Sequence, residues 1–238
     1  MFQWNKLIDN FSKYYYTPLL MLIVEATALV IAIIYIRKTK IGKAFIFYIT
    51  FDFSVLIVDC FLISNPGIAP KFRSQFMAYI NNLIALIELL VYYYFFYILL
   101  PNRKIKNLMK ALALFFVVII VVYVITRLNF LTNRFTYISY LIGVTEFIFL
   151  LPPCFFYFYN ILTVDSEVSL LKRPTFWIVT GILFYSLISI PYYLLNRYLS
   201  DRDTQLWSTL QAALYIIPFT LNFAFLIKAF LCKKTLTI

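Results

Sequence analysis

The run AYINNLIALIELLVYYYFFYILL, residues 78–100, decides the class of this chain. A helix needs about 20 mostly apolar residues to cross the hydrocarbon core of a bilayer. This run is long enough and contains a single carboxylate residue, Glu88. Lys71 and Arg73 precede it, and Arg103 and Lys104 follow it. The stretch therefore predicts a transmembrane helix between two basic connections.

Six further runs of the same kind lie along the chain. The chain is 63% hydrophobic and only 13% charged, whereas a typical soluble domain is about 25% charged. We therefore expect an all-α polytopic membrane bundle of about seven transmembrane helices over residues 17–231. The fourth run is the shortest. The predicted spans are 17–36, 44–63, 78–100, 111–125, 137–162, 175–195 and 207–231.

Basic residues alternate between rich and poor connections, which predicts the orientation of the chain. Cytoplasmic loops carry an excess of Lys and Arg, so the richer connections are assigned to the cytoplasm. This gives an N-out, C-in multi-pass protein of the inner (plasma) membrane. The net charge of +11 is assigned to contact with anionic lipid rather than nucleic acid. The richer set is Arg37, Lys38, Lys40 and Lys43, then Arg103, Lys104, Lys106 and Lys110, then Lys172 and Arg173, then Lys233 and Lys234.

The two ends of the chain are short. Over residues 1–16, Trp4, Leu7, Ile8 and Phe11 recur at helical spacing. This pattern predicts either an amphipathic helix on the outer leaflet or a frayed start of the first span. Residues 232–238 are predicted to be a short cytoplasmic tail. No soluble catalytic domain is expected.

Residue types exclude several kinds of site. The chain has no histidine, which removes most zinc enzymes and all histidine-based triads. Cys60, Cys154 and Cys232 lie far apart and form no CxxC pair, so they are interpreted as small apolar side chains. We expect no enzyme activity, no cofactor and no metal site.

Acidic residues inside the predicted spans are the main functional signal. An ionisable group at bilayer depth is costly, so such groups should face the bundle interior or a wet cavity. Glu25, Glu88 and Glu146 are each predicted roughly 12–15 Å below the outer edge, at 1.5 Å per residue. Asp59 is predicted to join them in the outer half, and Asp52 is the main acid of the inner half. The predicted pocket residues are Glu25, Asp59, Glu88, Glu146, Asn81, Gln211 and Asp52.

Two interpretations of these acids stay open. The functional one is an outward-facing pocket for a cation, a protonated amine or water, since like charges this close cannot all stay ionised. The structural one is a set of interhelical hydrogen bonds. Prolines 152, 153, 191 and 218 interrupt the last three spans and can kink them. The aromatic runs 92–97 and 155–159 are interpreted as belts at the membrane interface.

Three segments carry a resemblance to a known group. They are Ile87–Leu90 running into the aromatic run 92–97, RPTFWI at 173–178 running into GILFY at 181–185, and a last span that begins near Trp207 and closes on two lysines. With these segments the chain resembles standalone seven-helix membrane proteins common in Bacteroidota. Its layout is also similar to the seven-helix sensor modules of bacterial histidine kinases.

The resemblance and the acids together favour a sensory or accessory module. It would bind a small cationic ligand in the outer half and signal to a separate membrane or cytoplasmic protein. The alternatives are a proton- or cation-coupled transporter or channel, and a structural subunit of a membrane complex. The inner half is largely aromatic and aliphatic, which favours a pocket closed at its inner end over a pore.

Overall fold

The computed structural model describes residues 16–64, 70–128, 135–163, 170–202 and 204–232, and every long element in them is an α-helix. The predicted amphipathic segment, apart from Tyr16, lies outside these residues, as does most of the predicted tail. All seven predicted spans are confirmed as helices. They are α2 (Tyr16–Tyr35), α3 (Lys40–Ser64), α4 (Pro70–Leu99), α5 (Arg103–Leu128), α6 (Phe135–Thr163), α7 (Pro174–Arg202) and α8 (Thr204–Phe230). A 3₁₀ turn, η1 (Leu170–Lys172), precedes α7.

The fourth helix is longer than its sequence predicted. We expected residues 111–125, but α5 begins at Arg103 and ends at Leu128. The Asn102 side chain accepts a 2.9 Å hydrogen bond from the Lys104 main-chain N–H and so caps the start of the helix. The lysine and arginine residues in the first turns of α5 are good helix formers. They are too polar, however, to be counted as part of a hydrophobic span.

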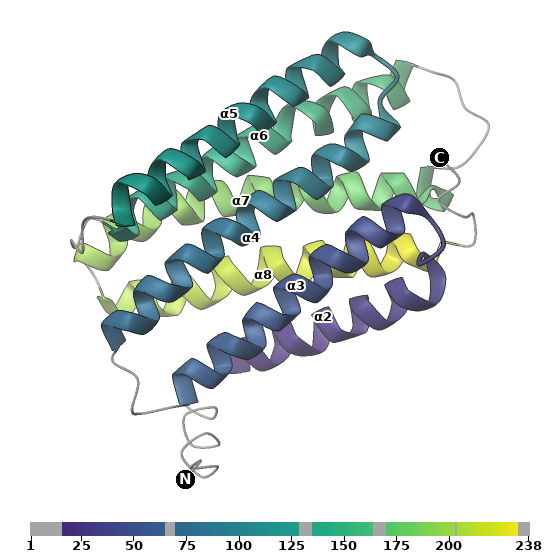
Figure 1. The fold of residues 1–238 in the computed structure, drawn as a ribbon. Helices are drawn as coiled ribbons and strands as arrows, with labels where there is room; N and C mark the ends of the chain where they lie inside the picture. Colours follow the sequence, from purple (N-terminus) through teal and green to yellow (C-terminus); the bar gives the residue numbers. More distant parts are fainter. Residues whose placement is uncertain (1–15, 65–69, 129–134, 164–169, 203, 233–238) are drawn as a thin grey trace.

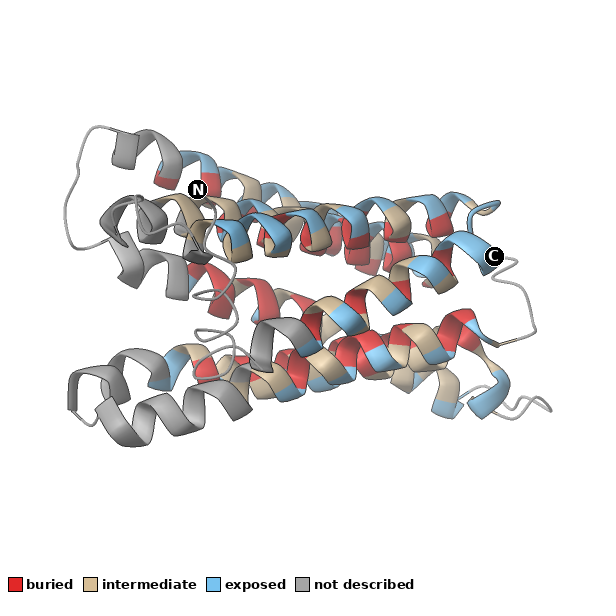
Figure 2. Ribbon diagram, turned by 90° about the horizontal axis from the view of Figure 1, so that it is seen from below, coloured by how far each residue is buried: buried red, intermediate tan, exposed pale blue. Residues whose placement is uncertain are grey.

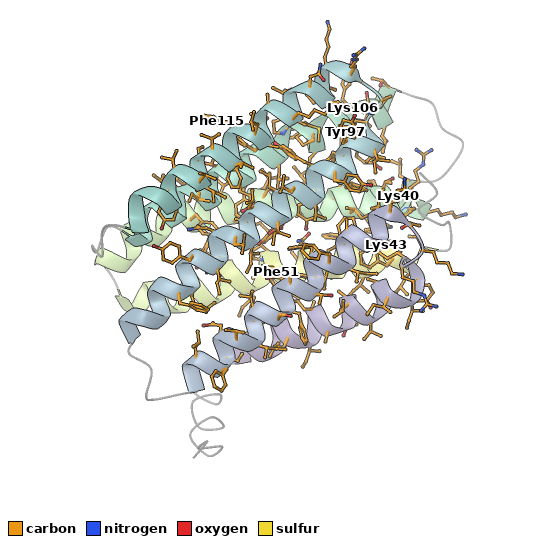
Figure 3. All side chains as sticks on the ribbon, viewed as in Figure 1. Lys40, Lys43, Phe51, Tyr97, Lys106 and Phe115 are labelled. Carbon is orange, nitrogen blue, oxygen red and sulfur yellow. The ribbon has the colours of Figure 1, made fainter. Side chains whose placement is uncertain are left out.

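Membrane insertion follows from helix length and surface chemistry. Five helical segments, one each in α3 to α7, are long and apolar enough to cross a bilayer. The described parts of α2 and α8 contribute shorter apolar segments. Large apolar side chains are exposed on the outer surface, for example Leu114 at 67% and Phe115 at 56%, and Phe115 points away from the bundle in Figure 3. These surfaces require lipid, so the protein is a multi-pass membrane protein.

The helices form a closed ring with one helix outside it. The order of contacts around the ring is α2, α3, α4, α6, α7 and α8, and α8 packs back against α2 (Figure 1). Helix α5 lies outside the ring and covers α4 and α6. Buried positions face the ring interior and exposed positions face outward (Figure 2). Each of the six ring helices therefore presents one face to a shared interior.

Successive helices alternate in direction, so one end of the bundle collects the basic connections. The α2–α3 and α4–α5 connections, the end of α6, the turn η1 and the end of α8 all lie there (Figures 1 and 3). We call this the basic end. Lys106 and Lys110 place their ammonium groups 4.8 Å and 5.0 Å from the Tyr97 ring centroid, which anchors α4 and α5 together there.

The α2–α3 connection at the basic end is tightly specified. The Thr39 hydroxyl donates to the Ile36 carbonyl oxygen at 3.1 Å and accepts from the Gly42 N–H at 2.9 Å. Thr39 thereby caps α3. A Cβ atom on Gly42 would collide with the Ile36 carbonyl oxygen, so glycine is required at this close approach.

Candidate functional site

The ring interior contains four buried carboxyl groups, each from a different helix. Glu25 comes from α2, Asp52 from α3, Glu88 from α4 and Glu146 from α6. Their side chains are between 1% and 9% exposed. We call these four residues the carboxyl layer. Buried polar groups on the two remaining ring helices, Ser186 and Ser189 on α7 and Asn222 on α8, complete the polar interior.

The layer lies near the middle of the bundle. Glu25 precedes the end of α2 by ten residues, Asp52 follows the start of α3 by twelve, and Glu88 precedes the end of α4 by eleven. At 1.5 Å per residue these positions are roughly 15–18 Å from the basic end. Asp52 therefore belongs to the layer, although its sequence position predicted an inner-half acid separate from the others.

Asp52 and Glu25 form the first contact in the layer. Their side chains hydrogen-bond each other. Because an ionised carboxylate is only an acceptor, a hydrogen bond between two carboxyl groups requires a proton on one of them. The pair therefore carries at most one negative charge. Glu25 Oε2 has no hydrogen-bond partner among the described atoms.

Glu88 is bound by tyrosine hydroxyl groups. Tyr48 on α3 and Tyr92 on α4 both hydrogen-bond its carboxyl group. The Tyr92 hydroxyl also accepts a 2.9 Å bond from Asn222 Nδ2, which ties α4 to α8 across the ring. This hydrogen-bonded chain satisfies one oxygen of Glu88, whereas Oε1 has no partner among the described atoms.

Glu146 is the fourth acid of the layer. It is 3% exposed, and it lies close enough to Glu88 and Asp52 for direct charge interaction. Its Oε1 has no hydrogen-bond partner within the described part of the chain. Buried polar atoms are nearly always paired, so this unpaired carboxyl oxygen beside another acid is an exception within the described interior.

The other predicted pocket residues lie outside this layer. Asp59 is half-buried, two turns farther from the basic end on the same face of α3 as Asp52. Asn81 is exposed, while the adjacent Asn82 is 4% exposed. Asn81 lies two turns before Glu88 on α4. Gln211 belongs to α8, but its side chain lies outside the described ones.

The aromatic run 92–97 is not an interfacial belt, and that interpretation was wrong for most of it. Tyr92, Tyr93, Phe95 and Phe96 are at most 5% exposed, because their helix faces the ring on one side and is covered by α5 on another. Only Tyr94 and Tyr97, each 39% exposed, lie at the surface. In the run 155–159, by contrast, most rings are exposed, and Tyr157 is the buried exception.

Aromatic side chains fill the interior between the carboxyl layer and the basic end. Phe45 contacts Phe95 and Phe230, each at 5.9 Å between ring centroids. All three side chains are at most 2% exposed, as is Leu226. We call Phe45, Phe95 and Phe230 the aromatic plug. On the other side of the layer, Asp59 on α3 is half-buried and Asn81 on α4 is exposed.

Sequence reasoning missed the tyrosine and asparagine partners of the acids. Tyr48 lies four residues before Asp52, and Tyr92 lies four residues after Glu88. Residues spaced by four share a helix face, so this spacing was the signal that could have found them. No sequence signal links Asn222 to Tyr92, since 130 positions separate them.

Comparison with known proteins identifies no relative of this chain. The chain matches no protein-family model, no curated protein and no solved structure. Among the described residues, no group of three His, Cys, Asp or Glu side chains is arranged to hold a metal ion. The function is therefore argued from the carboxyl layer and its surroundings.

Proposed function

We propose that this protein is a plasma-membrane module that binds a small cation at the carboxyl layer and passes the binding event to a separate partner protein. The observation that carries the proposal is the set of unpaired, buried carboxyl oxygens on Glu25, Glu88 and Glu146. No Lys or Arg is among the buried residues of the described chain. A bound cation would offset the repulsion among the acids, which burial in a low dielectric strengthens.

The interior favours binding over conduction. The aromatic plug occupies the ring between the layer and the basic end, and its side chains are almost fully buried. On the opposite side of the layer, Asp59 is half-buried and Asn81 is exposed. A cation bound at the carboxyl layer would meet the plug on its way to the basic end and stop there. This arrangement suits a pocket closed at one end.

The binding event would reach the basic end through the helices themselves. The layer joins α2, α3, α4 and α6, so a cation that draws the acids together alters how these helices pack. Near the basic end the α2–α3 turn is capped by Thr39, and α6 and α7 are joined by the 3.0 Å bond between Tyr157 and Thr175 hydroxyls. These contacts would pass a shift on to a partner, provided that two states differ in cation affinity.

Cation binding is tested with the full chain in lipid nanodiscs. We expect small amines or monovalent metal ions to raise the unfolding temperature, because a ligand that binds only the folded state stabilises it. Glu88→Gln should abolish the effect. Asp59→Asn removes a membrane acid outside the carboxyl layer and should retain it. An unchanged response of Glu88→Gln to every cation would refute the proposal.

Coupled transport is the second candidate. Prolines interrupt three neighbouring helices, α6 at 152 and 153, α7 at 191 and α8 at 218. Each proline removes a main-chain donor and can bend its helix, which supports movement around the layer. Proteoliposomes distinguish the two functions. Cation or proton flux that Glu88→Gln abolishes would favour a carrier, whereas binding without flux favours the sensory module.

A further inference from the structure

We propose that the cation is a protonated primary amine whose ammonium group is held between Glu88 and Glu146. This inference rests on the proposed function and specifies its ligand class. The two acids come from adjacent ring helices, α4 and α6, and they act on each other directly. Each has an Oε1 atom with no hydrogen-bond partner among the described atoms.

The unpaired atoms around the layer can all accept hydrogen bonds. Besides Glu88 Oε1 and Glu146 Oε1, they include Asn222 Oδ1 and Ser186 Oγ. All four residues are at most 4% exposed, so bulk water does not hydrogen-bond to these atoms. An alkylammonium group has three N–H donors and no acceptor. Its three donors can bond the unpaired carboxyl and amide oxygens, and its charge strengthens each bond.

The hydrogen bonds within the layer distinguish the Glu25–Asp52 pair from the Glu88–Glu146 pair. Glu25 and Asp52 bond each other and therefore share a proton. Glu88 instead accepts from the Tyr48 and Tyr92 hydroxyl groups, a pattern that fits an ionised carboxylate. Glu146 lies next to Glu88, and its Oε1 has no such donor within the described chain. The two adjacent unpaired oxygens thus belong to the Glu88–Glu146 pair, which is therefore the place in the layer best suited to a cation.

The aromatic side chains next to this pair are suited to contact with the alkyl chain of an amine. Tyr48, which bonds Glu88, stacks on Phe223 at 6.4 Å between ring centroids and 17° between planes. Phe219 adjoins Phe223 at 4.8 Å and lies one turn farther from the basic end. These rings extend from the layer away from the basic end. Aromatic faces attract organic cations and favour an alkyl group over a hydrated metal ion.

An N-methylation series tests the inference on the unmodified full chain in nanodiscs. The probes are butylamine, N,N,N-trimethylbutylammonium, sodium chloride and potassium chloride, each followed by calorimetric titration and by the unfolding temperature. We expect butylammonium to bind and its trimethylated analogue, which has the same charge but no N–H donor, to bind at least about tenfold more weakly. Equal binding of the two would overturn the donor argument.

Three variants locate the site. Glu146→Gln should weaken butylammonium binding by roughly tenfold to 100-fold, the loss expected for one charge-assisted hydrogen bond. Glu25→Gln should weaken it less, and Asp59→Asn should leave it unchanged. Binding that depends equally on Asp59 would place the amine elsewhere. Binding of sodium or potassium through Glu146, without amine binding, would refute the amine and leave the cation proposal standing. Absence of all binding would refute both.

Discussion

The Tyr93 hydroxyl group on α4 donates a 2.9 Å hydrogen bond to the main-chain carbonyl oxygen of Phe149 on α6. In an uninterrupted helix this oxygen would accept from the N–H four residues later, but position 153 is proline. Tyr93 thus supplies the donor that Pro153 lacks. A side chain from a neighbouring helix satisfies the main-chain acceptor, as the apolar interior of a membrane requires.

We expect Tyr93→Phe to destabilise the bundle by about 1 kcal/mol, since the Phe149 carbonyl loses its partner. In a Pro153→Ala background the same change should cost less, because an alanine restores the main-chain donor that the proline lacks. Unfolding in mixed detergent measures both values in a double-mutant cycle. Tyr94→Phe, on an exposed neighbouring ring, is the control. An equal cost in both backgrounds would contradict this account of the proline.

Replacing Gly42 should disrupt the α2–α3 turn. Because a Cβ atom there would meet the Ile36 carbonyl oxygen, Gly42→Ala must displace α3 or break the Thr39 cap. We expect a loss of about 1–3 kcal/mol in the free energy of unfolding, typical of overpacking. Lys43→Ala changes the next, exposed position and should be close to neutral. The prediction fails if the two variants unfold alike.

Removing a charge from the carboxyl layer should stabilise the protein while removing its function. Glu146 is buried beside other acids, and its unpaired oxygen has no partner to lose. We expect Glu146→Gln to raise the free energy of unfolding without ligand by about 1 kcal/mol, as is common when a functional site is neutralised. Unfolding curves without added amine measure this. A destabilised Glu146→Gln would instead indicate that the acid holds the helices together.

How far the sequence predicted the structure depends on the range of each interaction. Hydropathy over about 20 residues is a local property, and it located all seven helices. The burial of Glu25, Glu88 and Glu146 followed from the cost of an exposed acid in lipid. The partners of these acids did not follow, because contacts such as Asn222 with Tyr92 depend on which helices are neighbours in the ring.

The wrong predictions for individual residues have the same cause. Tyr92 and Phe95 were assigned to an interfacial belt from composition alone, but α5 and the ring enclose their helix. Asn81 shares a helix face with Glu88, yet it is exposed, and at its level the neighbouring helices cover the side of α4 that bears Asn82. Periodicity gives the direction of a side chain but not what lies opposite it.

The predicted N-out, C-in orientation can be tested with a native cysteine. Cys232 is partly exposed and lies at the basic end, whereas Cys154 is buried inside α6. In a Cys60→Ser variant we expect a membrane-impermeant maleimide to modify Cys232 only when the cytoplasmic side is open, as in inverted vesicles. Cys154 should react only after unfolding. Labelling of Cys232 from intact cells would reverse the orientation.

Access to the carboxyl layer should come from the side opposite the basic end. Asn81 is exposed on the face of α4 that also bears Glu88, whereas Ala229 on α8 is 1% exposed at the basic end. In a chain without native cysteines, we expect Asn81→Cys to react with a small aqueous thiol reagent from the opposite side, because Asn81 is exposed and lies two turns farther from the basic end than Glu88.

Ala229→Cys is the matched buried control and should stay unmodified, since its small side chain is enclosed near the aromatic plug. Butylamine at saturating concentration should slow the modification of Asn81→Cys if the amine passes this position to reach Glu88. Mass spectrometry of nanodisc and oriented-vesicle samples measures both rates. Modification of Ala229→Cys at the rate of Asn81→Cys would show that the interior is open at both ends, and a channel would then fit the bundle better than a closed pocket.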